Sequence, residues 1–253
     1  MAKETVNLQE LPSGTQQFGP WALVEAVMAG LPKRQARPRV ILKYAQSIDG
    51  RISTATGQSQ GLSSKPEQVF THALRSVCDG ILVGVGTVTA DNPRLTVRHV
   101  HGRNPRRIIV DPGLRIPRET HIYRDPRGTI LVHDPGRGTE RVKELTARGF
   151  TLLTARCESD PRSLDLLDFL DRLRSDMVIE TLLVEGGGYV ITSFLKARAV
   201  DRLVVSVCPR IIGSGRDAVG PLGVSTVGQA LRVRKMVTYS VGEDYALIGK
   251  PAL

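Results

Sequence analysis

The chain has 253 residues, 41% of them hydrophobic, and a formal net charge of +10. This length and hydrophobic content suffice for one large α/β domain or two small ones. No apolar run approaches the roughly 20 residues that span a bilayer, and the N-terminal sequence MAKETVNLQELPSG lacks the layout of a signal peptide. We therefore expect a cytoplasmic protein that does not associate with a membrane.

The positive charge raises the question of a nucleic-acid partner, because basic patches supply much of the affinity for nucleic acids. However, only 4% of the residues are aromatic, and no zinc-finger spacing or stacking motif accompanies the charge. Many basic residues lie in short loops such as 103–107 and 115–118. We therefore expect small phosphorylated ligands and no nucleic acid, with a solvated basic face as the alternative.

The cysteines and histidines give no sign of a metal site. Cys78, Cys157 and Cys208 are scattered, and each lies in or beside an apolar stretch, which favours buried free thiols over a disulfide or a zinc site. The five histidines have no H-E-x-x-H or comparable spacing. We expect no bound metal.

In chain order, residues 1–37 form an N-terminal extension with a short helix over 20–31 and a linker, followed by one main domain over 38–253. Strands are predicted at 39–46, 80–85, 107–111, 129–133, 150–154, 181–185 and 202–209, with a final pair at 235–241 and 244–249. Helices are predicted at 65–77, 138–148, 163–175 and 188–198.

The predicted strands have nearly continuous apolar runs, which is typical of a sheet that is covered on both faces. Because strands and helices alternate, we expect a mostly parallel sheet with right-handed crossovers. The last two strands are separated by a Gly-Glu pair, which predicts a C-terminal antiparallel hairpin. The fold class is therefore α/β.

In such a sheet, ligands bind where strands end and helices begin. The strand 182-LLVE-185 leads through Glu185 to three consecutive glycines at the start of a predicted helix. Glycines allow a phosphate to approach the first backbone N–H groups of the helix, and a carboxylate can accept hydrogen bonds from a polar ligand. The alternative is a tight turn without a ligand, which requires one or two glycines. The G-x-G-x-x-G fingerprint is absent.

Lys43 interrupts an otherwise apolar strand, and a buried lysine requires a partner, either a carboxylate such as Glu185 or a ligand. Downstream, Asp49-Gly50 is a turn signal in its own right, so the role of Asp49 stays open. A third stretch combines Arg75, the glycine-rich strand end 84-GVGT-87 and the arginine-bearing turn 91–98. Guanidinium groups bind phosphate bidentately, so this stretch indicates a phosphate site. A fourth, 110-VDPGLRIP-117, has the pattern of a simple loop.

Several motifs together carry a family resemblance: KYAQSIDGRISTATGQSQ, DGILVGVGTVTADNPRLTVR, RRIIVD, LLVEGGG and VDRLVVSVCPRIIGSG. They are similar to the riboflavin-biosynthesis pyrimidine reductases, the RibD C-terminal family, over residues 39–249. The resemblance implies a dihydrofolate-reductase-like three-layer fold and a homodimer. It also implies NADPH-dependent reduction of the ribosyl group of a 5-phosphoribosylamino-pyrimidine to a ribityl chain.

The resemblance carries over residue by residue. The positions that match the family's substrate contacts are Ser59, Arg75, Leu95, Arg98 and Glu185. Those that match its cofactor contacts are Ala45, Gly61, Thr87, Asp91, Gly187, Gly188, Tyr189, Val190, Ile191, Thr192 and Ser193. Lys43 and Glu185 are the expected catalytic residues, with Lys43 orienting the substrate and delivering a proton.

The chain also departs from the family. Many bifunctional members have a tryptophan after the Ser-Gln pair, where this chain has Gly61. The deaminase signature with its zinc ligands is absent, which indicates the stand-alone type and leaves either the deaminated or the undeaminated pyrimidine as substrate. Two other functions remain open: a reductase of the same fold that acts on a pterin or another small molecule, and a non-catalytic basic binding module.

Overall fold

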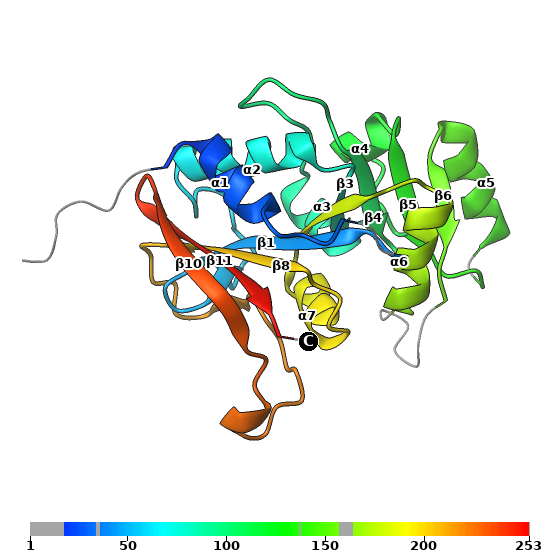
Figure 1. Cartoon of the computed structure of the whole chain (residues 1–253). Coiled ribbons are helices and arrows are strands. Elements are labelled where there is room, and N and C mark those ends of the chain that lie inside the picture. The colour runs from blue at the N-terminus through cyan, green and yellow to red at the C-terminus, as the bar shows by residue number, and fades with distance from the viewer. Residues whose placement is uncertain (1–17, 34–35, 137, 157–163, 253) are drawn as a thin grey trace, which may run out of the picture.

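A computed structural model of the chain describes residues 18–33, 36–136, 138–156 and 164–252. Nine strands form its main sheet: β1 (Arg39–Ser47), β3 (Gly80–Gly84), β4 (Arg106–Val110), β5 (Thr129–His133), β6 (Thr151–Thr154), β7 (Thr181–Gly186), β8 (Arg202–Cys208), β10 (Val233–Val241) and β11 (Asp244–Pro251). Their spatial order is β10-β11-β8-β1-β7-β3-β4-β5-β6 (Figure 1).

The seven strands from β8 to β6 are all parallel, whereas β11 pairs antiparallel with β8, and β10 pairs antiparallel with β11. This arrangement confirms the predicted parallel sheet with a C-terminal antiparallel hairpin. Consecutive residues of β1 point to opposite faces, so Ile41 packs in one hydrophobic cluster while Val40 and Leu42 pack in another. Both faces of the sheet are therefore buried.

Helices cover the two faces and give the molecule three layers (Figure 1). They are α1 (Pro20–Met28), α2 (Lys65–Val77), α3 (Val85–Asp91), α4 (His121–Arg124), α5 (Thr139–Arg148), α6 (Leu166–Ser175) and α7 (Gly188–Lys196). Phe169 of α6 and Phe194 of α7 pack on one face, and Phe70 of α2 packs with Leu23 of α1 on the other. The latter contact places the helix of the N-terminal segment directly on the core.

Several short elements of the structure differ from the sequence-based predictions. The short strands β2 (Arg51–Thr54) and β9 (Gly215–Asp217) were not predicted, and they pair antiparallel in a second small sheet. The segment after β3, predicted as a strand end, is the helix α3, because Val85 and Val88 turn into a hydrophobic cluster. The turn itself falls at Asn92, which caps α3 in the left-handed region with a φ of 44°.

The cysteines that the structure describes agree with the predicted free thiols. Cys78 and Cys208 are buried and unpaired, while Cys157 lies outside the described residues. Burial raises the pKa of both thiols, that of Cys208 to about 12, so neither is a thiolate at neutral pH.

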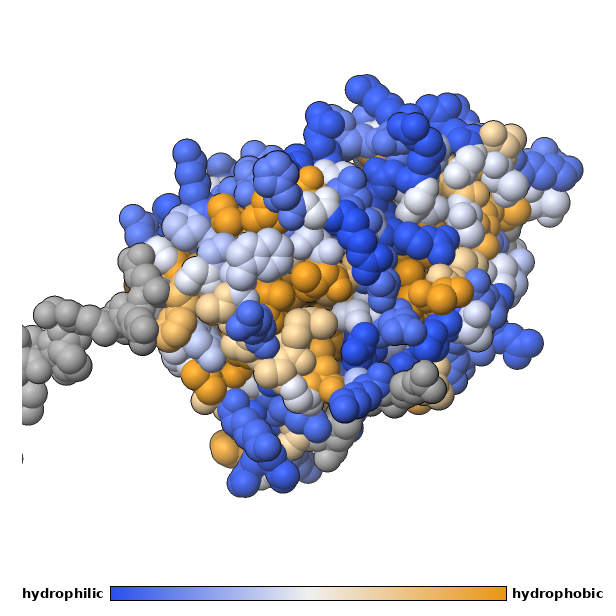
Figure 2. Space-filling model, turned by 45° about the horizontal axis from the view of Figure 1, so that its top comes forward, coloured by the Kyte–Doolittle hydropathy of each residue, from blue (hydrophilic) through white to orange (hydrophobic). Residues whose placement is uncertain are grey.

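Within the described ranges, no group of three or more His, Cys, Asp or Glu residues is arranged to hold a metal ion. No helix in those ranges is both long and apolar enough to cross a membrane. Hydrophilic side chains cover most of the face shown in Figure 2, and apolar residues form patches toward its middle.

Candidate functional site

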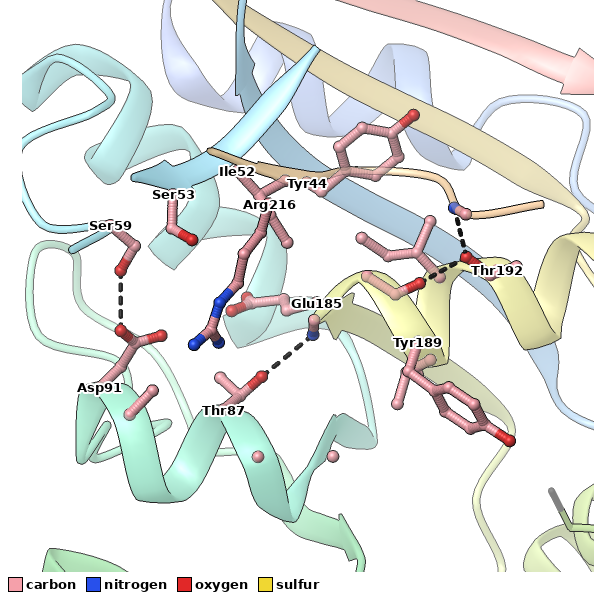
Figure 3. Close-up of a pocket in the computed structure, with 18 of the residues that line it drawn as sticks. Tyr44, Ile52, Ser53, Ser59, Thr87, Asp91, Glu185, Tyr189, Thr192 and Arg216 are labelled. Atoms are coloured by element: carbon pink, nitrogen blue, oxygen red, sulfur yellow. Dashed lines mark hydrogen bonds between the residues drawn. The ribbon is translucent and has the colours of Figure 1, made fainter. Parts of the chain in front are cut away.

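A cavity of about 1100 Å³ lies where the carboxyl ends of β1, β3, β4 and β7 meet α3, α7 and the small sheet. Figure 3 shows side chains from these elements pointing into it. Its position agrees with the general rule for open α/β sheets. The volume is at the upper end of the range for small-molecule sites, so the cavity can hold a large ligand or two smaller ones.

Most of the predicted site residues converge on this cavity. Its walls include Lys43, Ala45, Ser59, Thr87, Asp91, Glu185, Gly187, Gly188, Tyr189, Val190, Ile191 and Thr192. Five others do not line it: Gly61, Arg75, Leu95, Arg98 and Ser193. Of these, Leu95 is only 2% exposed and packs in the core with a φ of 54°, so its side chain is a structural element beneath the site.

Lys43 is buried, as predicted, but its carboxylate partner differs from the expected one. Its ammonium group forms an ion pair with Glu67 and donates a hydrogen bond of 2.6 Å to Thr71. The Glu67 carboxylate also accepts a hydrogen bond of 2.9 Å from Ser206. Burial alone would raise the pKa of Glu67, but the charge of Lys43 and these hydrogen bonds lower it. The prediction of a carboxylate partner for Lys43 is confirmed, but the partner is Glu67 and not the suggested Glu185.

Glu185 instead pairs with Arg75. The Arg75 Nε and Nη2 atoms donate to the two carboxylate oxygens at 2.7 and 2.6 Å, in the bidentate geometry that suits a guanidinium. The remaining terminal nitrogen of Arg75 donates to the Thr96 carbonyl at 3.2 Å. Burial opposes ionisation of Glu185, but the Arg75 charge and hydrogen bonds lower its pKa, so this carboxylate is charged at neutral pH. Arg75 thus holds Glu185 at the cavity wall.

One helix supports both cavity groups. Glu67, Thr71 and Arg75 are spaced four residues apart on α2, so they lie on one face of that helix. Glu67 lies behind Lys43, and Arg75 lies behind Glu185. The four charges alternate in sign, so the buried cluster is neutral overall and each ion has a partner. This neutrality reduces the cost of burying charged groups.

Packing around the turn after β7 accounts for its glycines. Gly186 has a φ of 102°, and a Cβ at Gly188 would lie 2.7 Å from the backbone oxygen of Asp217 in the small sheet. The Gly187 N–H donates to the Thr87 hydroxyl at 3.0 Å (Figure 3). These packing constraints account for the glycines without a ligand, so the number of glycines does not by itself favour one. The turn nevertheless exposes backbone to the cavity at the first turn of α7, where N–H groups have no partner within the helix.

Polar contacts join the elements that surround the cavity. Ser59 donates to the Asp91 carboxylate at 2.8 Å and so joins the loop after β2 to α3 (Figure 3). Thr192 on α7 accepts a hydrogen bond of 2.8 Å from the Gly220 N–H. These contacts fix the position of two cavity walls on either side of the glycine turn.

A basic cluster lies beside the Arg75 and Glu185 pair. The Arg98 N–H donates to Nδ1 of His72 at 2.8 Å, and the His72 ring packs against His99 with ring centres 4.4 Å apart. Burial and the charges of Arg75 and Arg98 lower the pKa of His72 to about 4, so this histidine is neutral at pH 7. The exposed Arg98 side chain is available to an anionic ligand.

Other cavity residues were missed in the sequence. Pro112, Gly113 and Arg115 belong to the stretch interpreted as a simple loop, and Arg216 belongs to the unpredicted strand β9. Figure 3 shows the Arg216 side chain reaching into the cavity above α3. The position of residues 112–115 directly after a buried parallel strand was a usable signal. Nothing in the sequence pattern indicated that Arg216 would join them.

Comparisons with known proteins agree with this geometry. The RibD C-terminal domain model matches residues 38–247. A riboflavin biosynthesis protein RibD of Aquifex aeolicus is 36% identical over 85% of this chain and 58% of that protein. A protein of Methanothermobacter thermautotrophicus named 2,5-diamino-6-ribosylamino-4(3H)-pyrimidinone 5′-phosphate reductase is 38% identical over 82% of this chain and 95% of that protein.

Among solved structures, the Saccharomyces riboflavin biosynthesis reductase Rib7 aligns with a TM-score of 0.71 and 27% identity, over 92% of this chain and 99% of that one. Acinetobacter baumannii RibD aligns with a TM-score of 0.74 and 25% identity, over 87% of this chain and 59% of that one. The chain therefore spans about 60% of the length of such RibD proteins and nearly all of the reductase. These matches confirm the expected dihydrofolate-reductase-like fold, and the chain belongs to the RibD C-terminal domain family.

Proposed function

We propose that this protein is an NADPH-dependent reductase of riboflavin biosynthesis. Its substrate would be a 5-phosphoribosylamino-pyrimidine, whose ribosyl group it reduces to the ribityl form. The observation that carries the proposal is the placement of Lys43 and Glu185 in one cavity with the glycine turn after β7. The name and the 38% identity of the Methanothermobacter reductase support the same substrate class.

Reduction of the ring-opened sugar imine adds a hydride to C1 and a proton to the attached nitrogen. A bound nicotinamide cofactor supplies the hydride. Lys43 lines the cavity as an ammonium group with a fixed position, since Glu67 and Thr71 hold its nitrogen. We infer that Lys43 orients the sugar and delivers the proton from Nζ, whose third hydrogen is not engaged by Glu67 or Thr71.

Glu185 is suited to the pyrimidine. Its carboxylate is charged and faces the cavity, where it can accept hydrogen bonds from the amino groups of the base or from a ribose hydroxyl. Arg75 holds this carboxylate in position. The two Arg75 nitrogens that bind Glu185 are therefore not available to the substrate phosphate. The exposed Arg98, beside this ion pair but outside the cavity lining, is the better candidate for the 5-phosphate, and Ser59 contacts the substrate from the cavity wall.

The cofactor would lie along the glycine turn and α3. The first turn of α7 favours negative charge, and the cavity walls there come from Gly187, Gly188 and Thr192. Thr87 and Asp91 on α3 also line this cavity, and the hydrogen bond from Gly187 to Thr87 joins the two helices, so a dinucleotide lying across this contact reaches both. Ala45 also lines this cavity.

We further propose a homodimer that works in the cytoplasm, with residues 1–37 as an extension of the reductase domain. β10 is an edge strand of the main sheet, and its Met236 and Val237 side chains are 57% and 50% exposed. An exposed apolar edge strand is a site that natural proteins usually cover. Light scattering on the purified protein would test the homodimer, and a monomer at micromolar concentration would contradict it.

The test of the proposed function is the oxidation of NADPH by the purified protein, followed by absorbance. The deaminated and the undeaminated ribosylaminopyrimidine phosphates are offered separately. Turnover of either supports the proposal, and the faster one identifies the natural substrate. If neither is reduced while NADPH still binds, the riboflavin assignment fails and another substrate, such as a pterin, has to be sought.

A further inference from the structure

The loop between α3 and β4 carries Arg98, which is the proposed contact of the substrate phosphate. Residues 92–105 of this loop contain no helix and no strand. The backbone N–H and C=O groups of such a segment have to find partners among side chains or water. Leu95 is 2% exposed and anchors the start of the loop in the core. Beyond Leu95, the position of Arg98 therefore depends on the side chains that bind the backbone of the loop.

Helix α2 supplies two of these side chains. Arg75 donates from Nη1 to the Thr96 carbonyl at 3.2 Å, and His72 accepts the Arg98 N–H on Nδ1 at 2.8 Å. His72 and Arg75 are three residues apart, so they lie on the same side of the helix. One donor and one acceptor of α2 thus hold the two ends of the short segment 96–98.

The bond to His72 is the contact that ties the Arg98 backbone to the helix. The Val97 N–H also has a side-chain partner, Asn104 at 2.8 Å, but Asn104 is exposed and belongs to the same loop, so it does not fix the loop relative to α2. His72 is only 4% exposed, and the His99 ring packs against it edge to face. Because Nδ1 accepts a hydrogen bond, the His72 ring is neutral with its proton on Nε2, and an imidazolium would have no lone pair for Arg98.

The Arg98 side chain has few contacts of its own. Its Nη1 donates to the hydroxyl of Thr96, two residues away in the same loop, at 3.2 Å. Burial and the charges of Arg75 and Arg94 lower the pKa of Arg98, so like charges lie near it, and a phosphate within its reach would relieve their repulsion. The backbone of the loop therefore decides where the Arg98 guanidinium can reach.

We propose that His72 is a positioning residue, which sets the distance between the Arg98 guanidinium and the Glu185 carboxylate. The inference rests on the proposed reductase function, in which Arg98 binds the phosphate and Glu185 binds the pyrimidine. The same helix holds both groups, since Arg75 binds the Glu185 carboxylate while His72 binds the Arg98 backbone. Helix α2 therefore fixes the separation that a substrate needs between its base and its phosphate. His72 does not line the cavity, so it acts through Arg98 and not on the ligand.

Two amide variants separate the role of Nδ1 from that of the rest of the ring. The side-chain oxygen of asparagine can take the place of Nδ1, whereas that of glutamine lies one bond further out, at the place of Nε2. His72→Gln should raise the KM of the phosphorylated pyrimidine roughly three- to tenfold, and His72→Asn should keep it near the wild-type value. In both variants kcat should change by less than about twofold and the Kd of NADPH should stay unchanged, because losing a contact that is equal in the ground and transition states raises KM alone.

Thr120→Val is the matched control. Thr120 is also buried, at 3% exposed, and accepts a backbone N–H from Tyr123, but it does not line the cavity. This variant should lower the stability of the protein and leave the substrate KM unchanged. Thermal unfolding establishes that each variant is folded. If His72→Gln does not fold, His72→Ser takes its place, because the serine hydroxyl is too short to reach the loop.

A double variant decides whether His72 acts through Arg98. In the Arg98→Ala background, His72→Gln should raise the substrate KM no further, because the guanidinium that it positions is gone. Additive increases overturn the inference, as do equal KM values in His72→Asn and His72→Gln, or a loss of NADPH affinity that parallels the rise in KM. A wild type that reduces neither pyrimidine contradicts the proposed function itself, whereas wild-type turnover with an unchanged KM in His72→Gln contradicts only the inference.

Discussion

The ion pair between Lys43 and Glu67 predicts a large and specific loss of stability when it is broken. The substitution Glu67→Gln keeps the size of the side chain but leaves the Lys43 ammonium without a counterion. The two residues are only 5% and 2% exposed, so water is a poor substitute for the lost partner. Breaking a buried pair from one side costs about 3–5 kcal/mol of the free energy of unfolding.

We expect the lower end of that range, about 3 kcal/mol, because the amide oxygen of glutamine can still accept a hydrogen bond from Lys43. Lys43→Met leaves the Glu67 carboxylate buried with neutral partners such as the hydroxyls of Thr71 and Ser206, so its cost is similar. The double variant has no charge left to compensate. Its loss should be smaller than the sum of the two single losses by about 2 kcal/mol or more.

Urea denaturation of the four proteins at pH 7 measures this coupling. The exposed pair of Arg127 and Asp125 provides the matched control, with side chains 89% and 54% exposed. Its coupling energy should stay below about 1 kcal/mol. Additive losses at Lys43 and Glu67, within about 0.5 kcal/mol, would refute the reasoning that the two charges depend on each other.

Three further predictions concern the site. Glu185→Gln should lower kcat by roughly a hundredfold and leave the Kd of NADPH nearly unchanged. Steady-state kinetics and fluorescence titration measure the two constants, and a similar loss in both would show that Glu185 contacts both ligands. Arg98→Ala should raise the KM of the phosphorylated pyrimidine about tenfold or more and leave the KM of NADPH unchanged, because one charged contact to the 5-phosphate is lost; an unchanged substrate KM would place the phosphate elsewhere. His72 has a pKa of about 4 in the folded protein, below its ordinary value of 6.5, so it binds its proton mainly in the unfolded state. Stability should therefore fall as the pH drops from about 6.5 to 4. Denaturation of His72→Gln across this range should show a smaller fall, and identical pH profiles would rule out His72 as the cause.

The parallel core was predictable because each of its strands is a short apolar run with a clear end. β2 and β9 were not, since neither has a continuous apolar run and both are partly exposed. The helix α3 contains glycine and β-branched residues, which are poor helix formers, and burial of Val85 and Val88 outweighs that preference. In each case tertiary contacts decided the local structure.

The candidate site, like the fold, was predictable from the sequence only in part. The buried Lys43 was visible as a cation in an apolar strand, but its partner is 24 residues away on a helix. The four-residue spacing of Glu67, Thr71 and Arg75 was the available signal, because it places three polar side chains on one face of α2. The convergence of Arg115 and Arg216 had no local signal, since it depends on how β9 crosses the cavity.

The common origin of Glu67 and Arg75 on α2 has a mechanical consequence. Any displacement of that helix moves the supports of Lys43 and Glu185 together, as parts of one rigid body. The fully buried Phe70 on α2 fixes the position of this helix on the sheet. A substitution that changes the side-chain volume at Phe70 would therefore move Lys43 and Glu185 together. A residue that does not contact the ligand can in this way alter the geometry of the site.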